Sequence, residues 1–133
     1  MPTIVTLIDY SDITPSVIAR AEQLAKALHS RVILIHVVPN KHAGRTSIEE
    51  DYKELTSIGN RLAKTGVNVL VEQLLDADMC KVLHECKTWD AEWIIIGSYQ
   101  RSALYNWFVG SFGSDVLHKA HCPVVVVPAP PEQ

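Results

Sequence analysis

The sequence has little of several features that mark large classes of proteins. Its 133 residues carry a net charge of only -3 at pH 7, with three cysteines and six glycines. It contains no block of lysine and arginine and no basic helix face, so the electrostatic footprint of a nucleic-acid-binding protein is missing. No apolar stretch approaches the roughly 20 residues that a membrane-spanning helix needs. We therefore expect neither nucleic-acid binding nor membrane insertion.

The cysteines argue against a disulfide framework. Cys80, Cys86 and Cys122 are odd in number and lack C-x-x-C spacing. We interpret them as small hydrophobic residues buried in the core. The amino terminus enters an apolar run after three residues without a charged leader, which is not typical of a signal peptide. Together these observations predict a protein of the reducing cytoplasm.

Metal-binding and catalytic patterns are scarce as well. The six histidines show no convincing zinc spacing, and there is no G-x-S-x-G elbow and no glycine-rich loop ending in Gly-Lys-Ser. No nucleophile is paired with a base in an obvious way. His36 interrupts an apolar run, and we interpret it as a core or crevice residue rather than a general base. The sequence leaves enzymatic activity uncertain and favours a protein without it.

The apolar residues, by contrast, are plentiful and ordered. Hydrophobic residues make up 47% of the chain, enough for one domain over residues 1–133. Short apolar runs predict five strands. Alternation in the third run indicates a strand at a sheet edge. The predicted strands are Ile4–Ile8, Val32–Val38, Val67–Leu74, Trp93–Ile96 and Val124–Val127.

Helical patterns separate these runs. The first follows a capping candidate, Asp12 or Thr14, with Pro15 in its first turn. Ser47 and Glu50 resemble a capping box for the second helix, which Gly66 can end. The apolar stripe of the first helix comprises Val17, Ala21, Leu24, Ala25 and Leu28.

The third and fourth helices are predicted in the same way. Asp76 or Asp78 can cap the third helix. Its apolar residues are Met79, Val82, Leu83 and Cys86, and the fourth helix, after Gly110 and Ser111, has Val116, Leu117 and Ala120 on one face.

Strands and helices in strict alternation predict an open, doubly wound α/β fold. In such a sheet a ligand lies at the carboxyl ends of the strands, where the strand order reverses. Asp9 ends the first predicted strand, Val37 and Val38 end the second, and Gly97 ends the fourth, so we expect these residues to line one crevice.

The segment from Gly97 to Ser111 has the pattern of a phosphate-binding site. A strand ends at glycine, a loop follows, and Gly110-Ser111 begins a helix whose free N–H groups can face an anion. A plain helix cap at Gly110-Ser111 is the alternative interpretation.

These residues resemble the carboxyl-terminal signature of the universal stress protein family. Its nucleotide-binding members show Gly, two residues, Gly, nine residues, then Gly-Ser or Gly-Thr. Gly97 matches the first position and Gly110-Ser111 match the last two, while Gln100 replaces the second glycine. Arg101, Ser102 and Leu104 match a further Arg-Ser-x-Leu pattern, and Cys122-Pro123 with the following valines resembles the terminal strand of the family.

The resemblance implies a Rossmann-like five-stranded parallel sheet of order 3-2-1-4-5 with helices on both faces. It also implies a site for ATP, ADP or AMP, with or without Mg²⁺. Asp9 and the backbone near Val37 would meet the adenine and ribose, and the turn at Gly97 and Ser98 would meet ribose and phosphate. A turn acid that caps the next helix is the alternative role for Asp9. The implied nucleotide-binding residues are Asp9, Val37, Gly97, Ser98, Gln100, Arg101, Gly110, Ser111 and Phe112.

Three functional hypotheses follow. The first is a stress-response or regulatory module that binds an adenine nucleotide and acts through dimerisation and an unknown protein partner. The second is a dimeric interaction module without nucleotide, which Gln100 favours. The third is a weak nucleotide hydrolase. Because the run Val124–Val127 would be an exposed apolar edge in a monomer, we expect it to pair with a second copy.

Overall fold

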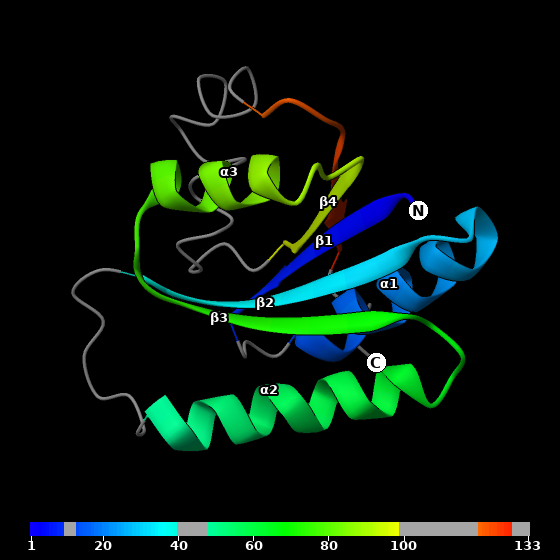
Figure 1. Cartoon of the computed structure of the whole chain (residues 1–133), viewed down its shortest axis with the longest axis horizontal. Helices are drawn as coiled ribbons and strands as arrows, with labels where there is room; N and C mark the ends of the chain where they lie inside the picture. The colour runs from blue at the N-terminus through cyan, green and yellow to red at the C-terminus, as the bar shows by residue number, and fades with distance from the viewer. Residues whose placement is uncertain (10–12, 40–47, 99–119, 129–133) are drawn as a thin grey trace.

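A computed structural model describes residues 1–9, 13–39, 48–98 and 120–128. These residues form one five-stranded sheet and three helices (Figure 1). The elements are β1 (Thr3–Ile8), α1 (Thr14–Leu28), β2 (Arg31–Pro39), α2 (Ile48–Ala63), β3 (Val69–Ala77), α3 (Met79–Thr88), β4 (Trp93–Gly97) and β5 (Val124–Val127).

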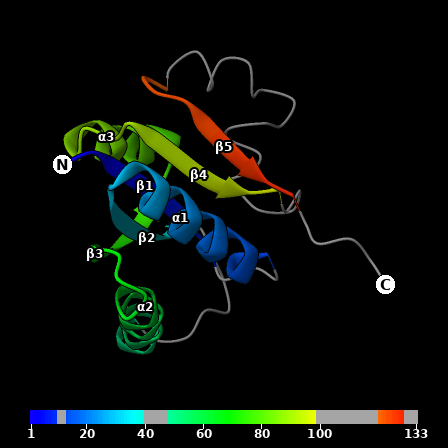
Figure 2. The same ribbon diagram turned by 90° about the vertical axis from the view of Figure 1, so that its right-hand side faces the viewer.

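The sheet has the order β3-β2-β1-β4-β5, and all its pairings are parallel. The chain builds outward from β1 to β3 and then returns to the other side of β1 for β4 and β5 (Figure 2). This confirms the predicted fold class and strand order. The reversal falls between β1 and β4, where the ligand crevice was expected.

Helices cover both faces of the sheet. Helices α1 and α2 pack on one face, around a buried cluster that includes Ile4, Leu34 and Ile95. Helix α3 packs on the other face, around a cluster that includes Val5, Ile35 and Ile94. The alternation of side chains along each strand therefore supplies one core on each side of the sheet.

The strands follow from the apolar runs. Every residue of β1 is buried, including Thr6, as expected for a central parallel strand. Strand β3 is buried in part and lies at an edge of the sheet, which confirms the interpretation of its alternating sequence. Its bounds differ from the prediction: Val67 precedes the strand, and pairing continues to Ala77.

The observed first residues of α1 and α3 show that one predicted helix cap was wrong and that another was right. Thr14 is the first residue of α1 rather than its cap; Ile13 occupies the cap position and makes no side-chain hydrogen bond there. Pro15 lies in the first turn, as predicted. At α3, Asp78 is the cap, and its Oδ1 accepts a hydrogen bond of 2.8 Å from the Lys81 amide. The other cap candidates, Asp12 and Ser47, lie outside the described residues.

Some exposures differ from the prediction. Leu28 is 40% exposed because α1 ends there and its last turn passes the margin of the sheet. Cys86 is buried as predicted, Cys122 is half-buried, and Cys80 is exposed on the outer side of α3. All three cysteines are free. Gly66, with φ of 101°, follows the end of α2, where its amide donates to the Ala63 carbonyl.

The predicted fourth helix lies outside the described residues, except that Ala120 is described and is not helical. Within the described ranges, no helix is both long enough and apolar enough to cross a bilayer.

Candidate functional site

Three predicted site residues, Asp9, Val37 and Ser98, lie at the carboxyl ends of neighbouring strands of the sheet. In the register of β1 with its neighbours, Ile8 is opposite His36 of β2, and Thr6 is opposite Ile95 of β4. One step past the first pair brings Asp9 beside Val37. Pairing of β1 with β4 ends at Thr6 and Ile95, and Ser98 follows the end of β4 on the other side of β1. The crevice residues expected from the sequence therefore follow neighbouring strands that end at the same edge of the sheet.

Gly97 ends β4 beneath the first turn of α1. A Cβ added at Gly97 would lie 2.5 Å from Cγ2 of Ile13 and 3.2 Å from Cγ2 of Val17. Real carbon atoms do not approach to 2.5 Å, so the glycine allows α1 to start directly on the end of β4. Among the described residues, the space left by the absent Cβ of Gly97 is filled by Ile13. From the sequence pattern we had expected this space to be used by a ligand.

Ser98 connects the site to the last strand. Its amide donates a hydrogen bond of 2.9 Å to the carbonyl of Val127 in β5. Ser98 is half-buried and takes part in a further interaction. A ligand that shifts the Ser98 backbone would therefore shift the end of β5 as well.

Val37 and His36 point to opposite faces of β2. The side chain of Val37 is buried against the α3 face, so only its backbone can meet a ligand, as the family resemblance implies. His36 is 5% exposed, which agrees with its interpretation as a core or crevice residue. Asp9 is half-buried and already engaged in an interaction, so it is held in place at the end of β1.

The other predicted site residues are Gln100, Arg101, Gly110, Ser111 and Phe112, and all lie outside the described residues. Their roles stay predictions. The described part of the chain also contains no group of three or more histidine, cysteine, aspartate or glutamate residues that could hold a metal ion.

The sequence did not predict that the first turn of α1 would border this candidate site. Ile13 and Val17 cover the end of β4, and the Val17 amide bonds to the Ile13 carbonyl at 3.1 Å. A signal was present in the sequence, because a glycine that ends a buried strand is often a point of close helix approach. Only the fold, however, shows which residue makes the approach.

The model of the universal stress protein family matches residues 1–128. The chain belongs to this family. No curated protein matches it closely. Among solved structures, a universal stress protein from Archaeoglobus fulgidus is 27% identical, covers 96% of this chain and 98% of its own, and superposes with a TM-score of 0.67.

Two other universal stress proteins of the same fold were solved with nucleotides. One, in complex with cAMP, is 20% identical over 96% of both chains, with a TM-score of 0.70. The other, from Archaeoglobus fulgidus in complex with dAMP, is 24% identical over 96% of this chain and 97% of its own, with a TM-score of 0.67. At these sequence identities, the similarity shows that this chain has the same fold as the two nucleotide complexes.

Proposed function

We propose that this universal stress protein binds ATP or a related adenine nucleotide at the carboxyl edge of its sheet and acts as a regulatory module in the cytoplasm. The observation that carries the proposal is that Asp9, Val37 and Ser98 lie at the carboxyl ends of neighbouring strands, at the point where the strand order reverses. Such a point is where open α/β sheets bind ligands.

The chemistry of the three residues suits an adenosine. The Asp9 carboxylate can accept hydrogen bonds from ribose hydroxyls or an amino group, and backbone groups after β2 can pair with the adenine edge. The Ser98 hydroxyl can donate a hydrogen bond to a ribose or phosphate oxygen. Complexes of two family members with cAMP and dAMP support an adenine nucleotide as the ligand class.

Occupancy would be transmitted to β5. This strand is the outermost on its side of the sheet, and its Val127 carbonyl accepts the Ser98 amide. We propose that β5 pairs with β5 of a second copy and that the nucleotide biases this pairing and the binding of a protein partner. Free cysteines agree with a reducing compartment.

Calorimetric titration of nucleotide into protein stripped of bound ligand tests the proposal. MgATP, AMP and cAMP are compared, and micromolar affinity, about 8 kcal/mol, is expected for at least one of them. Asp9→Asn removes the charge but keeps the shape, and it should weaken binding about tenfold. Asp90→Asn, at the amino edge before β4, is the matched control and should bind as the unmodified protein does.

Absence of binding by all three nucleotides would overturn the proposal. The second candidate function, a dimeric interaction module without nucleotide, would then stand. Gln100 favours it because a glutamine replaces a glycine of the family signature. The use of the Gly97 Cβ space by Ile13 adds to this, because packing alone then accounts for that glycine.

A further inference from the structure

A groove separates α1 from α2 on the outside of the sheet. Helix α1 packs mainly over β1 and β4, whereas α2 packs over β3, so the two helices stand apart. The space between them is a cavity of about 540 Å³, within the range of about 300–1,000 Å³ typical of small-molecule sites. From Thr14 to Glu22 it follows α1 for about 12 Å, at 1.5 Å per residue.

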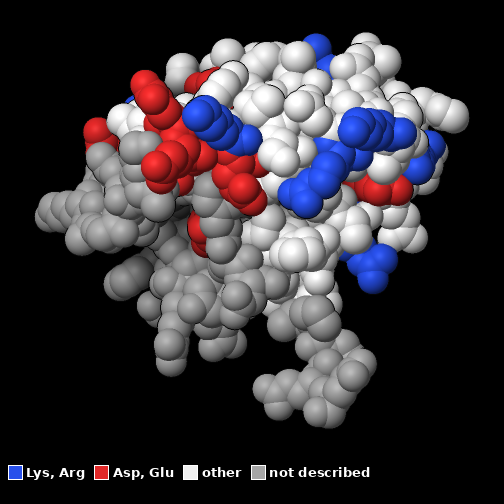
Figure 3. All heavy atoms as spheres, turned by 90° about the horizontal axis from the view of Figure 1, so that it is seen from below, with Lys and Arg blue, Asp and Glu red and all other residues white. Residues whose placement is uncertain are grey.

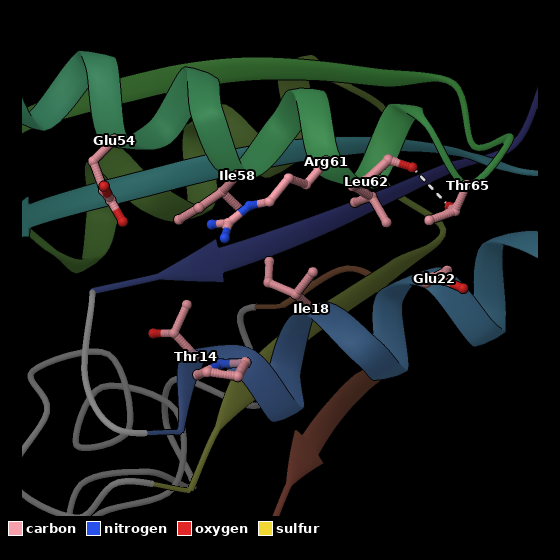
Figure 4. A pocket seen from close by; sticks show the side chains of 9 residues that line it. Thr14, Ile18, Glu22, Glu54, Ile58, Arg61, Leu62 and Thr65 are labelled. Atoms are coloured by element: carbon pink, nitrogen blue, oxygen red, sulfur yellow. Dashed lines mark hydrogen bonds between the residues drawn. The ribbon is translucent and has the colours of Figure 1, made fainter.

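Aliphatic side chains form the middle of the groove. Ile18 comes from α1, and Ile58 and Leu62 come from α2 (Figure 4). Among the described residues, no aromatic side chain lines it. Ile58 and Leu62 are almost fully buried and form the floor of the groove, while Ile18 is partly exposed beside them. An unbranched hydrocarbon chain on this floor would remove its own surface and the exposed part of Ile18 from water, whereas a planar ring would find no stacking partner there.

A cation reaches into this apolar stretch. The guanidinium of Arg61 extends beside Ile58 and faces α1 across the groove (Figure 4). Within the described residues Arg61 has no ion pair and no side-chain hydrogen bond. Its fork of donors matches a carboxylate, and the neighbouring isoleucine keeps water from part of the contact.

Carboxylates mark the two ends of the groove. Glu54 lies toward the starts of the helices, and Glu22, paired with Lys26 at 3.1 Å, lies toward their ends (Figure 4). A ligand with a second negative charge at its far end would meet one of them. The charges therefore select a single anionic group near Arg61 and disfavour a dianion or a polyphosphate.

The groove is distinct from the proposed nucleotide site. Helix α1 stands between the two: Ile13 and Val17 face the end of β4, whereas Pro15 and Ile18 face the groove. A nucleotide at Asp9 and Ser98 would leave the groove open.

We propose that the groove between α1 and α2 binds an amphipathic monocarboxylate with an aliphatic chain, such as a medium-chain fatty acid. The carboxylate pairs with Arg61 and the chain lies along Ile18, Ile58 and Leu62. This assigns the protein a second ligand site, with a ligand class different from the nucleotide.

Amide NMR spectra of the full chain, recorded during titration with sodium decanoate, test this site. Saturable shifts are expected at Ile18, Ile58 and Arg61 and their helical neighbours, with no displacement by AMP. Decanol, without charge, and decanedioate, with two charges, should each bind more weakly. Arg61→Gln should weaken decanoate binding about tenfold, because a charge-assisted contact is lost.

Arg20→Gln provides the matched control. Arg20 is an exposed arginine of α1 outside the groove, bonded to Gln23 at 2.7 Å, and its replacement should leave the affinity unchanged. Glu54→Gln should strengthen binding of decanedioate more than that of decanoate. Equal affinities for the two arginine variants, shifts centred away from the groove, or no saturable shifts at millimolar decanoate would each overturn the proposal. None of these readouts depends on nucleotide binding.

Discussion

The two edge strands of the sheet are built in opposite ways. Strand β3 has nine residues and carries polar side chains, whereas β5 is a run of four valines. An unprotected sheet edge invites pairing with another chain, and charges and kinks prevent it. Among the described residues, this difference predicts that the β3 edge resists pairing with another strand and that the β5 edge allows it.

The free side of β3 is blocked by its own neighbours. The Lys81 Nζ donates to the Leu75 carbonyl at 2.8 Å, and Gln73 Nε2 donates to the Ile48 carbonyl at 3.3 Å. Asp76 has φ of 50°, a left-handed conformation that bends the strand before Ala77. Another strand could not lie straight along this edge.

A polar cluster also ties β3 to α3. Trp89, at the end of α3, donates its indole N–H to the Glu72 carboxylate at 2.9 Å. The Arg31 guanidinium lies 5.5 Å from the Trp89 ring, and its Nε donates to Thr3 Oγ1 at 2.8 Å. Side chains from β1, β2, β3 and α3 thus meet in one cluster.

The surface formed by α2 separates its acidic and basic side chains. Acidic side chains gather at one end of that face and basic side chains toward the other (Figure 3). Glu49, Glu50 and Asp51 occupy the first turn of α2, and Arg61 lies in its last turn. This order complements the helix dipole and stabilises the helix that covers β3.

The largest expected effect is at the β5 edge. The carbonyls of Pro123 and Val127 accept amides of β4 and of Ser98, so the alternating backbone leaves the Val126 amide on the free side of β5. Val126→Pro removes that donor without breaking a bond to β4. We expect the dimer Kd to rise about a hundredfold, or about 2.7 kcal/mol, in light scattering at micromolar concentration.

Val69→Pro makes the same change at the β3 edge. The Asn68 carbonyl accepts the Val32 amide, so the Val69 amide is on the free side of β3. Its loss should leave the assembly unchanged. A native protein that is monomeric at micromolar concentration, or a dimer that withstands Val126→Pro, would contradict the proposed pairing at the β5 edge.

A smaller effect is expected where α2 meets β3. A Cβ at Gly59 would lie 2.5 Å from Cγ1 of Val71, a stiff β-branched side chain. Gly59→Ala gains about 1 kcal/mol of helix propensity, but overpacking costs about 1–3 kcal/mol. We expect a net loss of about 1 kcal/mol in the free energy of unfolding, measured with urea. Asn60→Ala, at an exposed neighbouring position, should be neutral or stabilising; equal gains in both variants would show that α2 has room to move.

The smallest effect concerns pH. Burial raises the pKa of Glu72, and the nearby Glu85 carboxyl raises it further, while the Trp89 hydrogen bond opposes them. A carboxyl whose pKa is raised on folding contributes stability below its unfolded pKa, near 4.5, and loses that contribution as pH rises through the folded value.

Glu72→Gln should therefore flatten the dependence of unfolding free energy on pH above about 4.5. At neutral pH it should raise stability by a few tenths of a kcal/mol, since the site is partly open to solvent. Urea unfolding at several pH values measures both effects. Glu92→Gln, an exposed control, should keep the native pH dependence. An unchanged profile in Glu72→Gln would show that burial and Glu85 do not raise the pKa of Glu72.

The sequence was sufficient for the architecture because its strands are continuous apolar runs. The alternation of runs and helical stripes predicted the α/β class, and the family resemblance supplied the strand order. Side-chain detail required the fold. Thr14 was a reasonable cap by residue type, yet Ile13 holds that position because it also packs on Gly97. Only Asp78, of two candidate caps, lies where its oxygen reaches the Lys81 amide.

The candidate sites differ in the same respect. The position of Asp9, Val37 and Gly97 at one edge of the sheet was predictable because each lies at or beside the end of an apolar run, and parallel strands bring their carboxyl ends together. Their role in binding a ligand stays a prediction. The groove was not predictable, since Ile18, Ile58 and Arg61 form it only when two helices pack on different strands. Periodicity identifies the face a helix buries but not the spacing between two helices.

The three cysteines differ in burial, so their rates of reaction with a thiol reagent can report local opening of the fold. Burial, with the nearby Cys122 and Glu85, raises the pKa of Cys86 to about 12, so its reactive thiolate is almost absent while α3 is in place. Cys80 is exposed, so it can react with an alkylating reagent as soon as the two are mixed. Cys86 will be labelled only as often as α3 lifts from the sheet, whereas Cys122, half-buried beside the start of β5, can react without such an opening. Mass spectrometry of the labelled peptides can thus time the opening of α3 against the reaction of Cys80, without an introduced probe.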